Sequence, residues 1–244
     1  MQKEAGHFWY SSWFDSPYYH ILYRDRDNKE AENFMDHLTT FLKLPKKSEI
    51  LDLACGKGRH SVYLNKLGYR VVGADLSAAS ILHAKQFENE SLQFIEHDMS
   101  LSFQKKFDAI FNLFTSFGYF EDEEDNLRTL KAIKAGLKDN GCAVIDFLNS
   151  GNVIKNLVPN ETKVIDDITF HIEKYLEDDH FIKNINFTHG GKEYDFTEKV
   201  RALTLKDFLR YFGRTGIMLK HCFGDYQLND YNEVSSERLI LIFN

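Results

Sequence analysis

Residues 50–60 read ILDLACGKGRH, and this stretch decides the fold of the chain. A short apolar run leads to Asp52, small residues and two glycines follow, and basic side chains come next. A strand, a small-residue loop and a helix in this order form a ligand-binding turn, because the free amides at the helix N-terminus point at the loop. The stretch therefore predicts a binding site at the end of the first strand of an α/β domain.

Strands and helices alternate along the chain from Pro45 to Asn149. Apolar runs of strand length predict five strands, at Glu49–Ala54, Arg70–Ala74, Leu92–Glu96, Phe107–Leu113 and Cys142–Leu148. Apolar residues at helical spacing predict helices between them, at His60–Leu67, Ser77 to about Asn89, and about Asp122 to Leu137. Because connections between parallel strands are right-handed, this rhythm predicts an α/β fold with a doubly wound, mostly parallel sheet.

A different pattern follows residue 150. Runs with partial period-two alternation predict an antiparallel β insertion, at Lys163–Tyr175, Asp179–His189 and Lys192–Leu203. Helical spacing returns at Thr204–Arg214, and Met218–Tyr226 and Arg238–Phe243 look like two closing strands. We therefore divide the chain into four segments: an N-terminal helical lid (1–44), a cofactor-binding α/β core (45–150), the β insertion (151–203) and the C-terminal completion of the core (204–244).

The composition excludes several classes of protein. The chain has 244 residues, of which 43% are hydrophobic and 27% charged, as in globular proteins. Its net charge of −7 disfavours nucleic acid and anionic membranes as partners, since both attract basic surfaces. The three cysteines show no CxxC pairing, the histidines show no metal-ligand spacing, and no stretch resembles a signal peptide. We expect a cytoplasmic protein without a metal site and without nucleic-acid or membrane partners.

The glycine loop and the acidic residues around it favour one kind of ligand. A dinucleotide fingerprint would read GxGxxG, but Ser61 stands where the third glycine belongs. Acidic residues instead end the first three strands, at Asp52, Asp75 and Asp98. A carboxylate after the second strand suits a ribose diol, and Asp98 can accept from an adenine amine while Met99 packs on the base. This negative field suits a ligand with a sulfonium and an ammonium group.

Five motifs resemble those of the class I S-adenosylmethionine-dependent methyltransferases. They are DLACGKG at 52–58, GADLS at 73–77, HDM at 97–99, FDAIFNLFTSFGYF at 107–120 and GLKDNGCAVIDF at 136–147. Ala54 departs from the glycine that many members of the family have, a mild change that still permits close approach. The resemblance implies a seven-stranded sheet with an antiparallel last strand and S-adenosylmethionine as cofactor. It assigns cofactor binding to Tyr19, Asp52, Ala54, Cys55, Gly56, Gly58, Asp75, Leu76, Asp98, Met99 and Leu113.

Aromatic residues crowd the N-terminal segment from Phe8 to Tyr23, which holds both tryptophans. One explanation is packing of the N-terminal helices on the rest of the protein. The other is a lid whose rings face the sulfonium or a cationic amine. The run YYHILY at 18–23 resembles the lid of small-molecule N-methyltransferases that act on amino sugars and glycine-like amines. In that comparison Tyr19 lies near the sulfonium and Tyr119 faces the substrate, so the resemblance implies that both are catalytic.

The sequence as a whole predicts an S-adenosylmethionine-dependent methyltransferase with a small-molecule acceptor, most specifically an amine. Two alternatives stay open: a nicotinamide-dependent oxidoreductase of Rossmann type, and a non-catalytic module that binds S-adenosylmethionine. Both a monomer and a homodimer are compatible with the resemblance, because the β insertion of related enzymes covers the active site and can support dimer contacts.

Overall fold

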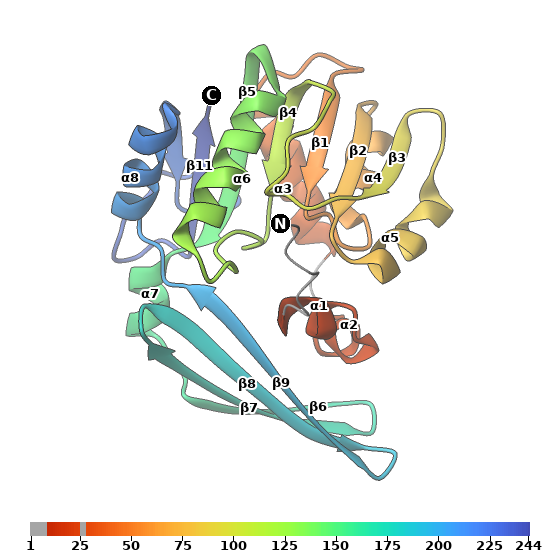
Figure 1. The fold of residues 1–244 in the computed structure, drawn as a ribbon, viewed down its shortest axis with the longest axis vertical. Helices are drawn as coiled ribbons and strands as arrows, with labels where there is room; N and C mark the ends of the chain where they lie inside the picture. Colours follow the sequence, from red (N-terminus) through yellow and green to blue (C-terminus); the bar gives the residue numbers. More distant parts are fainter. Residues whose placement is uncertain (1–8, 25–27) are drawn as a thin grey trace, which may run out of the picture. The chain divides into compact units, whose positions relative to one another are not determined.

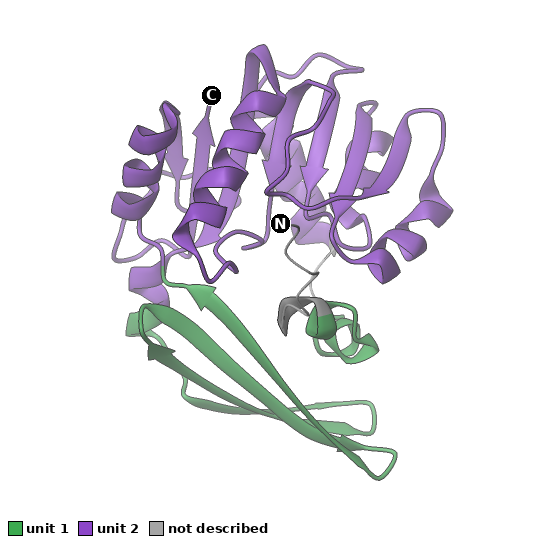
Figure 2. Ribbon diagram, viewed as in Figure 1, with its two compact units in different colours: residues 1–26, 154–202 green, residues 27–153, 203–244 purple. Residues whose placement is uncertain are grey.

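The computed structural model describes residues 9–24 and 28–244, which fall into two compact units (Figures 1 and 2). The α/β unit comprises residues 27–153 and 203–244, and the β-insertion unit comprises residues 1–26 and 154–202. The predicted lid at 1–44 includes residues 1–8 and 25–27, which lie outside the described residues. The four-segment division made from the sequence stays a prediction.

A seven-stranded sheet forms the centre of the α/β unit, in the order β10-β11-β5-β4-β1-β2-β3. Its strands are β1 (Glu49–Leu53), β2 (Arg70–Asp75), β3 (Leu92–Glu96), β4 (Phe107–Asn112), β5 (Leu137–Leu148), β10 (Leu219–Phe223) and β11 (Arg238–Phe243). The pairs among β1 to β5 are parallel, whereas β11 pairs antiparallel with β5 and β10. The predicted fold class is confirmed, and β1 lies beside the point where the strand order reverses.

Helices cover both faces of this sheet (Figure 1). They are α3 (Asn28–Phe41), α4 (Arg59–Lys66), α5 (Ala78–Ala84), α6 (Glu123–Gly136) and α8 (Leu205–Thr215). Phe34 of α3, Leu64 of α4 and Ile81 of α5 are buried in one apolar cluster with strand residues of one face. On the other face α6 contacts β4 and β5, and the ring of Phe208 in α8 packs on Phe147 of β5. Both faces are therefore buried, as a parallel sheet requires.

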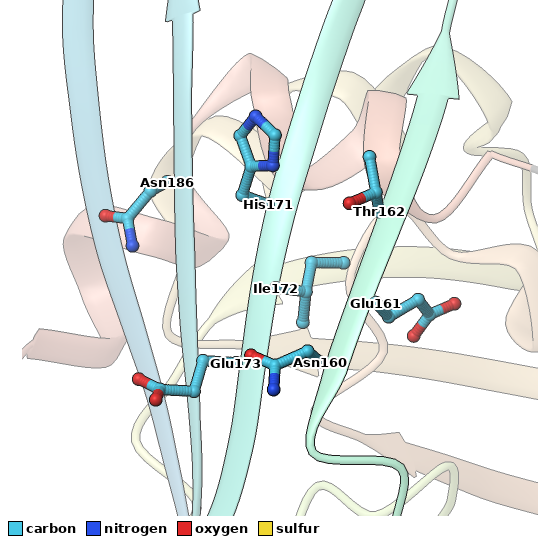
Figure 3. A pocket seen from close by; sticks show the side chains of 7 residues that line it. All are labelled: Asn160, Glu161, Thr162, His171, Ile172, Glu173 and Asn186. Carbon is cyan, nitrogen blue, oxygen red and sulfur yellow. The ribbon is translucent and has the colours of Figure 1, made fainter.

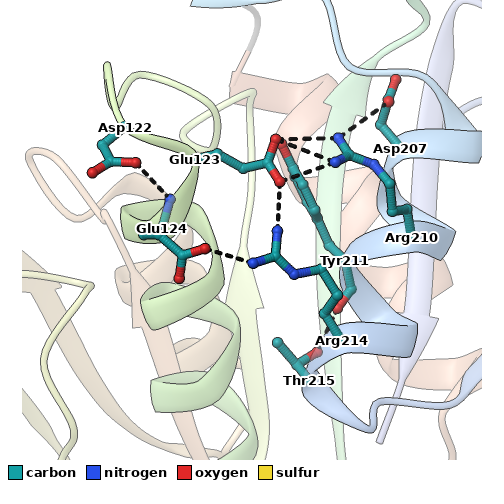
Figure 4. A network of polar contacts seen from close by, with 8 residues as sticks. All are labelled: Asp122, Glu123, Glu124, Asp207, Arg210, Tyr211, Arg214 and Thr215. Atoms are coloured by element: carbon teal, nitrogen blue, oxygen red, sulfur yellow. Dashed lines mark hydrogen bonds and ion pairs between the residues drawn. The ribbon is translucent and has the colours of Figure 1, made fainter.

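Ion pairs join the start of α6 to α8 (Figure 4). Asp122 caps α6, because its Oδ1 accepts a hydrogen bond from Glu124 N at 3.0 Å. The Glu123 carboxylate lies 3.0 Å from Arg210 Nη1 and 2.7 Å from Arg214 Nη1. Arg214 also pairs with Glu124 at 2.5 Å. The acidic run at the start of α6 thus serves to cap one helix and to hold another.

Three elements differ from the sequence prediction. The run Lys163–Tyr175 is two strands rather than one, because Asp166 adopts a left-handed conformation (φ 54°) and turns the chain. β5 begins at Leu137 rather than at Cys142, and its pairing with β4 jumps from Leu137 to Cys142, so residues 138–141 bulge out of the pairing. The helix after Ser77 ends at Ala84, and a 3-10 turn at Lys85–Phe87 follows it.

The β-insertion unit is a four-stranded antiparallel sheet in the order β6-β7-β8-β9, with helices α1 and α2 packed on it. Its elements are α1 (Trp9–Phe14), α2 (Pro17–Leu22), β6 (Asn160–Ile165), β7 (Ile168–Glu177), β8 (His180–His189) and β9 (Lys192–Arg201), and α7 (Ser150–Lys155) leads into it. Trp13 is fully buried against Phe170 and Ile185 in one apolar cluster. Packing therefore accounts for the described aromatic residues in this cluster.

Candidate functional site

The loop between β1 and α4 turns sharply within five residues. Ala54, Gly56 and Gly58 all adopt left-handed conformations, with φ of 61°, 55° and 84°. Gly58 has a steric reason to be glycine, because a Cβ atom there would lie 2.6 Å from ring carbons of the buried Phe94. A Cβ atom on Gly56 would instead meet nothing within 4 Å. The loop is closed by Phe94 on one side and open at Gly56, where a ligand can approach the backbone.

Asp75, at the end of β2, ties the glycine loop to the start of α5. Its Oδ2 accepts a hydrogen bond from Gly56 N at 2.7 Å, and its Oδ1 accepts one from Ser77 N at 2.8 Å. Ser77 in turn caps α5, since its Oγ accepts from Ser80 N at 3.0 Å. A carboxylate oxygen can accept more than one hydrogen bond. Asp75 is thus held in place beside the open part of the loop.

Buried titratable groups lie beneath the loop. Asp52 is 1% exposed, its Oδ2 accepts from Ser61 Oγ at 2.5 Å, and burial raises its pKa to about 6. Burial, with Arg59 alongside, lowers the pKa of His60 to about 3. Burial also raises the pKa of the Cys55 thiol well above its ordinary value. At neutral pH the Asp52 carboxylate is mostly charged while His60 and Cys55 stay neutral, so Asp52 can offset the positive charges of Lys57 and Arg59 beside it.

The remaining predicted cofactor residues lie where β2, β3 and β4 end. Asp98 and Met99 form a half-buried turn after β3, in which Asp98 Oδ1 accepts from Ser100 N at 2.8 Å. Leu76, directly after Asp75, is 40% exposed, and Leu113, directly after β4, is buried. The structure thus places these residues along one edge of the sheet, in the order predicted from strand direction.

Asn112, the last residue of β4, was not predicted. Its side chain is fully buried, and its Nδ2 donates to Leu53 O at 3.0 Å. Its Oδ1 has no hydrogen-bond partner among residues 9–24 and 28–244. A buried acceptor without a partner is costly unless a ligand or a water molecule donates to it. An ammonium group at the switch point beside β1 fits this oxygen. The only sign in the sequence was a polar residue that ends an apolar strand.

The loop after β4 carries the predicted catalytic residue Tyr119, which is half-buried. The loop begins with Phe114, whose ring lies under the Arg59 guanidinium at 4.7 Å and beside the His60 ring at 5.7 Å. Because Arg59 and His60 open helix α4, this loop packs directly on the end of the glycine loop. Two predicted parts of the site, the glycine loop and the segment after β4, are therefore in contact.

Tyr19, the other predicted catalytic residue, belongs to the β-insertion unit. Its half-buried ring packs edge-on against Trp13 at 5.6 Å and against Phe14 at 5.0 Å, and lies 4.9 Å from the Tyr23 ring. Tyr19 is thus held by its aromatic neighbours within its own unit. The catalytic roles of Tyr19 and Tyr119 stay predictions.

A depression of about 300 Å³ on the sheet of the β-insertion unit holds none of the predicted residues (Figure 3). It is lined by Asn160, Glu161, Thr162, His171, Ile172, Glu173 and Asn186. Within the described parts of the chain, no group of three histidine, cysteine or acidic side chains can hold a metal ion. Nor does any helix there combine the length and the apolar character needed to cross a membrane.

Comparisons with known proteins show which proteins this chain resembles. Residues 50–141, from β1 into β5, match the family described as a methyltransferase domain. The protein named "Putative methyltransferase YqeM" of Bacillus subtilis (strain 168) is 28% identical over 80% of this chain and 83% of that protein. A glycine/sarcosine N-methyltransferase of Halorhodospira halochloris is 31% identical over 52% of this chain. The chain spans only 50% of the length of that second relative.

The fold comparison gives the same architecture. A crystal structure of an S-adenosylmethionine-dependent methyltransferase from Clostridium acetobutylicum ATCC 824 matches with a TM-score of 0.79. The match covers 93% of this chain and 95% of that chain at 23% identity, a level that establishes the fold. The match to a methyltransferase domain therefore favours a methyltransferase over the nicotinamide-dependent oxidoreductase. Residues 50–141 match a methyltransferase domain, and the chain has the fold of a solved S-adenosylmethionine-dependent methyltransferase.

Proposed function

We propose that this enzyme transfers the methyl group of S-adenosylmethionine to the nitrogen of a small-molecule amine. The observation that carries the proposal is the open backbone at Gly56, held by Asp75 above buried acidic and neutral groups. The glycine/sarcosine N-methyltransferase relative supports an amine as acceptor. The acidic side chains of Asp52, Asp75 and Asp98 support a cationic donor in preference to a phosphate-bearing cofactor.

The proposed donor site follows the edge of the sheet. Asp75 accepts hydrogen bonds from the ribose hydroxyls, and Asp98 accepts from the adenine amine. Met99, Leu76 and Leu113 supply apolar contacts around the base.

The methionine part of the donor lies along the loop of Ala54, Cys55, Gly56 and Gly58 in this proposal. Asn112 Oδ1 accepts a hydrogen bond from the donor's ammonium group, which satisfies its buried oxygen. Asp52 adds negative charge beneath the loop.

S-adenosylmethionine supplies a methyl group that is already activated by its bond to a positively charged sulfur. The protein therefore contributes orientation and the exclusion of water. The hydroxyls of Tyr19 and Tyr119 orient the acceptor, and Tyr19 also lies near the sulfonium in this proposal. An acceptor amine that arrives neutral needs no strong general base, because its lone pair is available for attack.

Incubation with isotopically labelled S-adenosylmethionine and a panel of acceptors tests the proposal. The panel holds glycine, sarcosine and an amino sugar, each matched with its hydroxyl analogue, and mass spectrometry detects the labelled methyl group. We expect label on nitrogen in at least one amine and none on the hydroxyl analogues. Label on oxygen or carbon alone would refute the amine assignment, and no label on any compound, or on a metabolite extract, would favour the non-catalytic module.

The remaining expectations concern assembly and location. We propose a cytoplasmic enzyme that works as a monomer or homodimer and has no nucleic-acid partner. The net charge of −7 supports the absence of a nucleic-acid partner. Light scattering of the purified chain measures its mass, and a mass above that of a dimer would contradict the proposal.

A further inference from the structure

A buried ion pair between β5 and β11 holds the loop after β4. Asp146 on β5 is 0% exposed, and Arg238 Nε, at the start of β11, donates to its Oδ1 at 2.7 Å. The other carboxylate oxygen, Oδ2, accepts from Phe114 N at 2.9 Å and from Tyr226 OH at 3.1 Å. The Arg238 Nη2 group reaches further, to Thr115 Oγ1 at 3.0 Å. Two residues outside the predicted site therefore bind the backbone and side chain of the loop.

The loop residues held in this way have unfavourable backbone conformations. Phe114 has a φ of 63° and Thr115 a φ of 60°, both in the left-handed region. A β-branched residue such as threonine rarely adopts this conformation. Such residues persist only where their surroundings impose the conformation. Here Asp146 supplies those surroundings, since its backbone oxygen also accepts from Thr115 N at 2.9 Å.

The imposed conformation carries Phe114 to the glycine loop. Its ring is stacked with Tyr226 at 6.0 Å on one side and lies near Arg59 at 4.7 Å on the other. Arg59 is the first residue of α4, directly after Gly58. Phe114, which Asp146 holds, thus contacts the start of α4 directly after the glycine loop.

Stability alone does not explain this pair. Two buried charges lose their hydration, and apolar residues of similar size often stabilise a protein equally well or better. An apolar pair here would, however, leave the Phe114 amide and the Thr115 hydroxyl without the partners that fix the loop. The ion pair therefore supplies specific directions of hydrogen bonding that apolar packing cannot supply.

We propose that Asp146 and Arg238 are positioning residues of the methyltransferase, which shape the loop after β4 so that it forms one wall of the donor site. They act through Phe114 and Thr115 and do not themselves touch S-adenosylmethionine. The proposal rests on the proposed donor site for the identity of the ligand.

The decisive variant replaces both charges, Asp146→Leu with Arg238→Met. We expect the double variant to fold and to unfold at a lower temperature than the wild type, because the Phe114 amide and the Thr115 hydroxyl lose their partners. Titration calorimetry with S-adenosylmethionine should show affinity weaker by about tenfold or more, since at least one hydrogen bond that shapes the wall is lost. Hydrogen exchange at the Phe114 and Thr115 amides should accelerate, while the amides of β4 stay protected.

A milder pair of variants keeps the test valid if the double variant does not fold. Thr115→Val removes only the hydroxyl that contacts Arg238, and Thr129→Val makes the same change at a buried helical threonine whose hydroxyl bonds Asp125 O. We expect Thr115→Val to weaken donor binding several-fold, about one hydrogen bond, and Thr129→Val to leave it unchanged. The Arg238→Lys variant should bind S-adenosylmethionine with intermediate affinity. Lysine keeps the positive charge but cannot donate to Asp146 and Thr115 at once, as the planar guanidinium group does.

Wild-type donor affinity in both Thr115→Val and the double variant would overturn the proposal. Failure of the wild type to bind S-adenosylmethionine would instead refute the proposed function. In that case the exchange rates of the Phe114 and Thr115 amides still decide whether the ion pair holds the loop.

Discussion

Alanine substitutions at Gly56 and Gly58 distinguish two roles of the glycine loop, which are ligand approach at Gly56 and close packing on Phe94 at Gly58. Both residues are left-handed, so alanine at either position costs about 1–2 kcal/mol of backbone strain. Only at Gly58 would the new methyl group meet a neighbour, 2.6 Å from Cε1 and Cζ of Phe94. Carbon atoms attract best at about 3.5–4.0 Å, so the Phe94 ring has to move by about 1 Å.

Movement of a buried ring in a packed core costs about 1–3 kcal/mol. We therefore expect Gly58→Ala to lower the free energy of unfolding by about 2–5 kcal/mol, and Gly56→Ala by about 1–2 kcal/mol. Ala54 already occupies the same backbone region at φ 61°, which shows that the loop accommodates a methyl group there. Urea unfolding monitored by circular dichroism measures both values.

Gly58→Ala should have the larger effect on stability, whereas Gly56→Ala should have the larger effect on the binding of S-adenosylmethionine. A methyl group on Gly56 fills the open approach to the backbone, so Gly56→Ala should weaken affinity by about tenfold or more, one lost close contact. Gly191→Ala in the β8–β9 hairpin is the control, because it also has a left-handed φ (74°) and no neighbour within 4 Å. Equal loss of stability at positions 56 and 58, or wild-type affinity in Gly56→Ala, would refute the steric account.

Three further predictions concern pH, the β-insertion unit and turnover. His60 has a pKa lowered from 6.5 to about 3, so its contribution to stability is present above pH 6.5 and is lost as the pH falls. His60→Phe should flatten the fall in unfolding free energy between about pH 6.5 and 3, by up to about 5 kcal/mol over that whole range, and an unchanged slope would contradict this. Glu198 Oε1 accepts from Trp13 Nε1 at 2.7 Å, so Glu198→Leu should shift tryptophan emission while Glu198→Gln keeps it; identical spectra would be contrary evidence. Tyr19→Phe and Tyr119→Phe should each lower turnover of an identified acceptor about tenfold to thousandfold without lowering the melting temperature, and full turnover in both would make them structural.

Local sequence patterns predicted the fold well because they depend on neighbours along the chain. β3 and β11 have the predicted ends, and the alternation of apolar strands and helices gave the doubly wound class. The helix predicted from Ser77 begins there, because Ser77 caps it through a local hydrogen bond. The turn at Asp166 was missed, although Asp166 and Asp167 interrupt the apolar alternation between Ile165 and Ile168.

The candidate site was only partly predictable. Strand direction alone places Asp75 and Asp98 at one edge of the sheet, so their neighbourhood followed from the sequence. The reason for glycine at position 58 did not, because Phe94 comes from another strand. The pairing of Asp146 with Arg238 joins residues 92 positions apart through an antiparallel register, and no local pattern signals it.

Titration of S-adenosylmethionine into the wild type and Asp75→Ala tests the central claim most directly. The account predicts saturable binding to the wild type at one site per chain and no binding of NADH under the same conditions. Loss of the carboxylate that holds Gly56 and faces the proposed ribose should weaken binding by about 1–3 kcal/mol, with the melting temperature measured in parallel. Equal affinity of the wild type and Asp75→Ala for S-adenosylmethionine, or tighter binding of NADH, would contradict it.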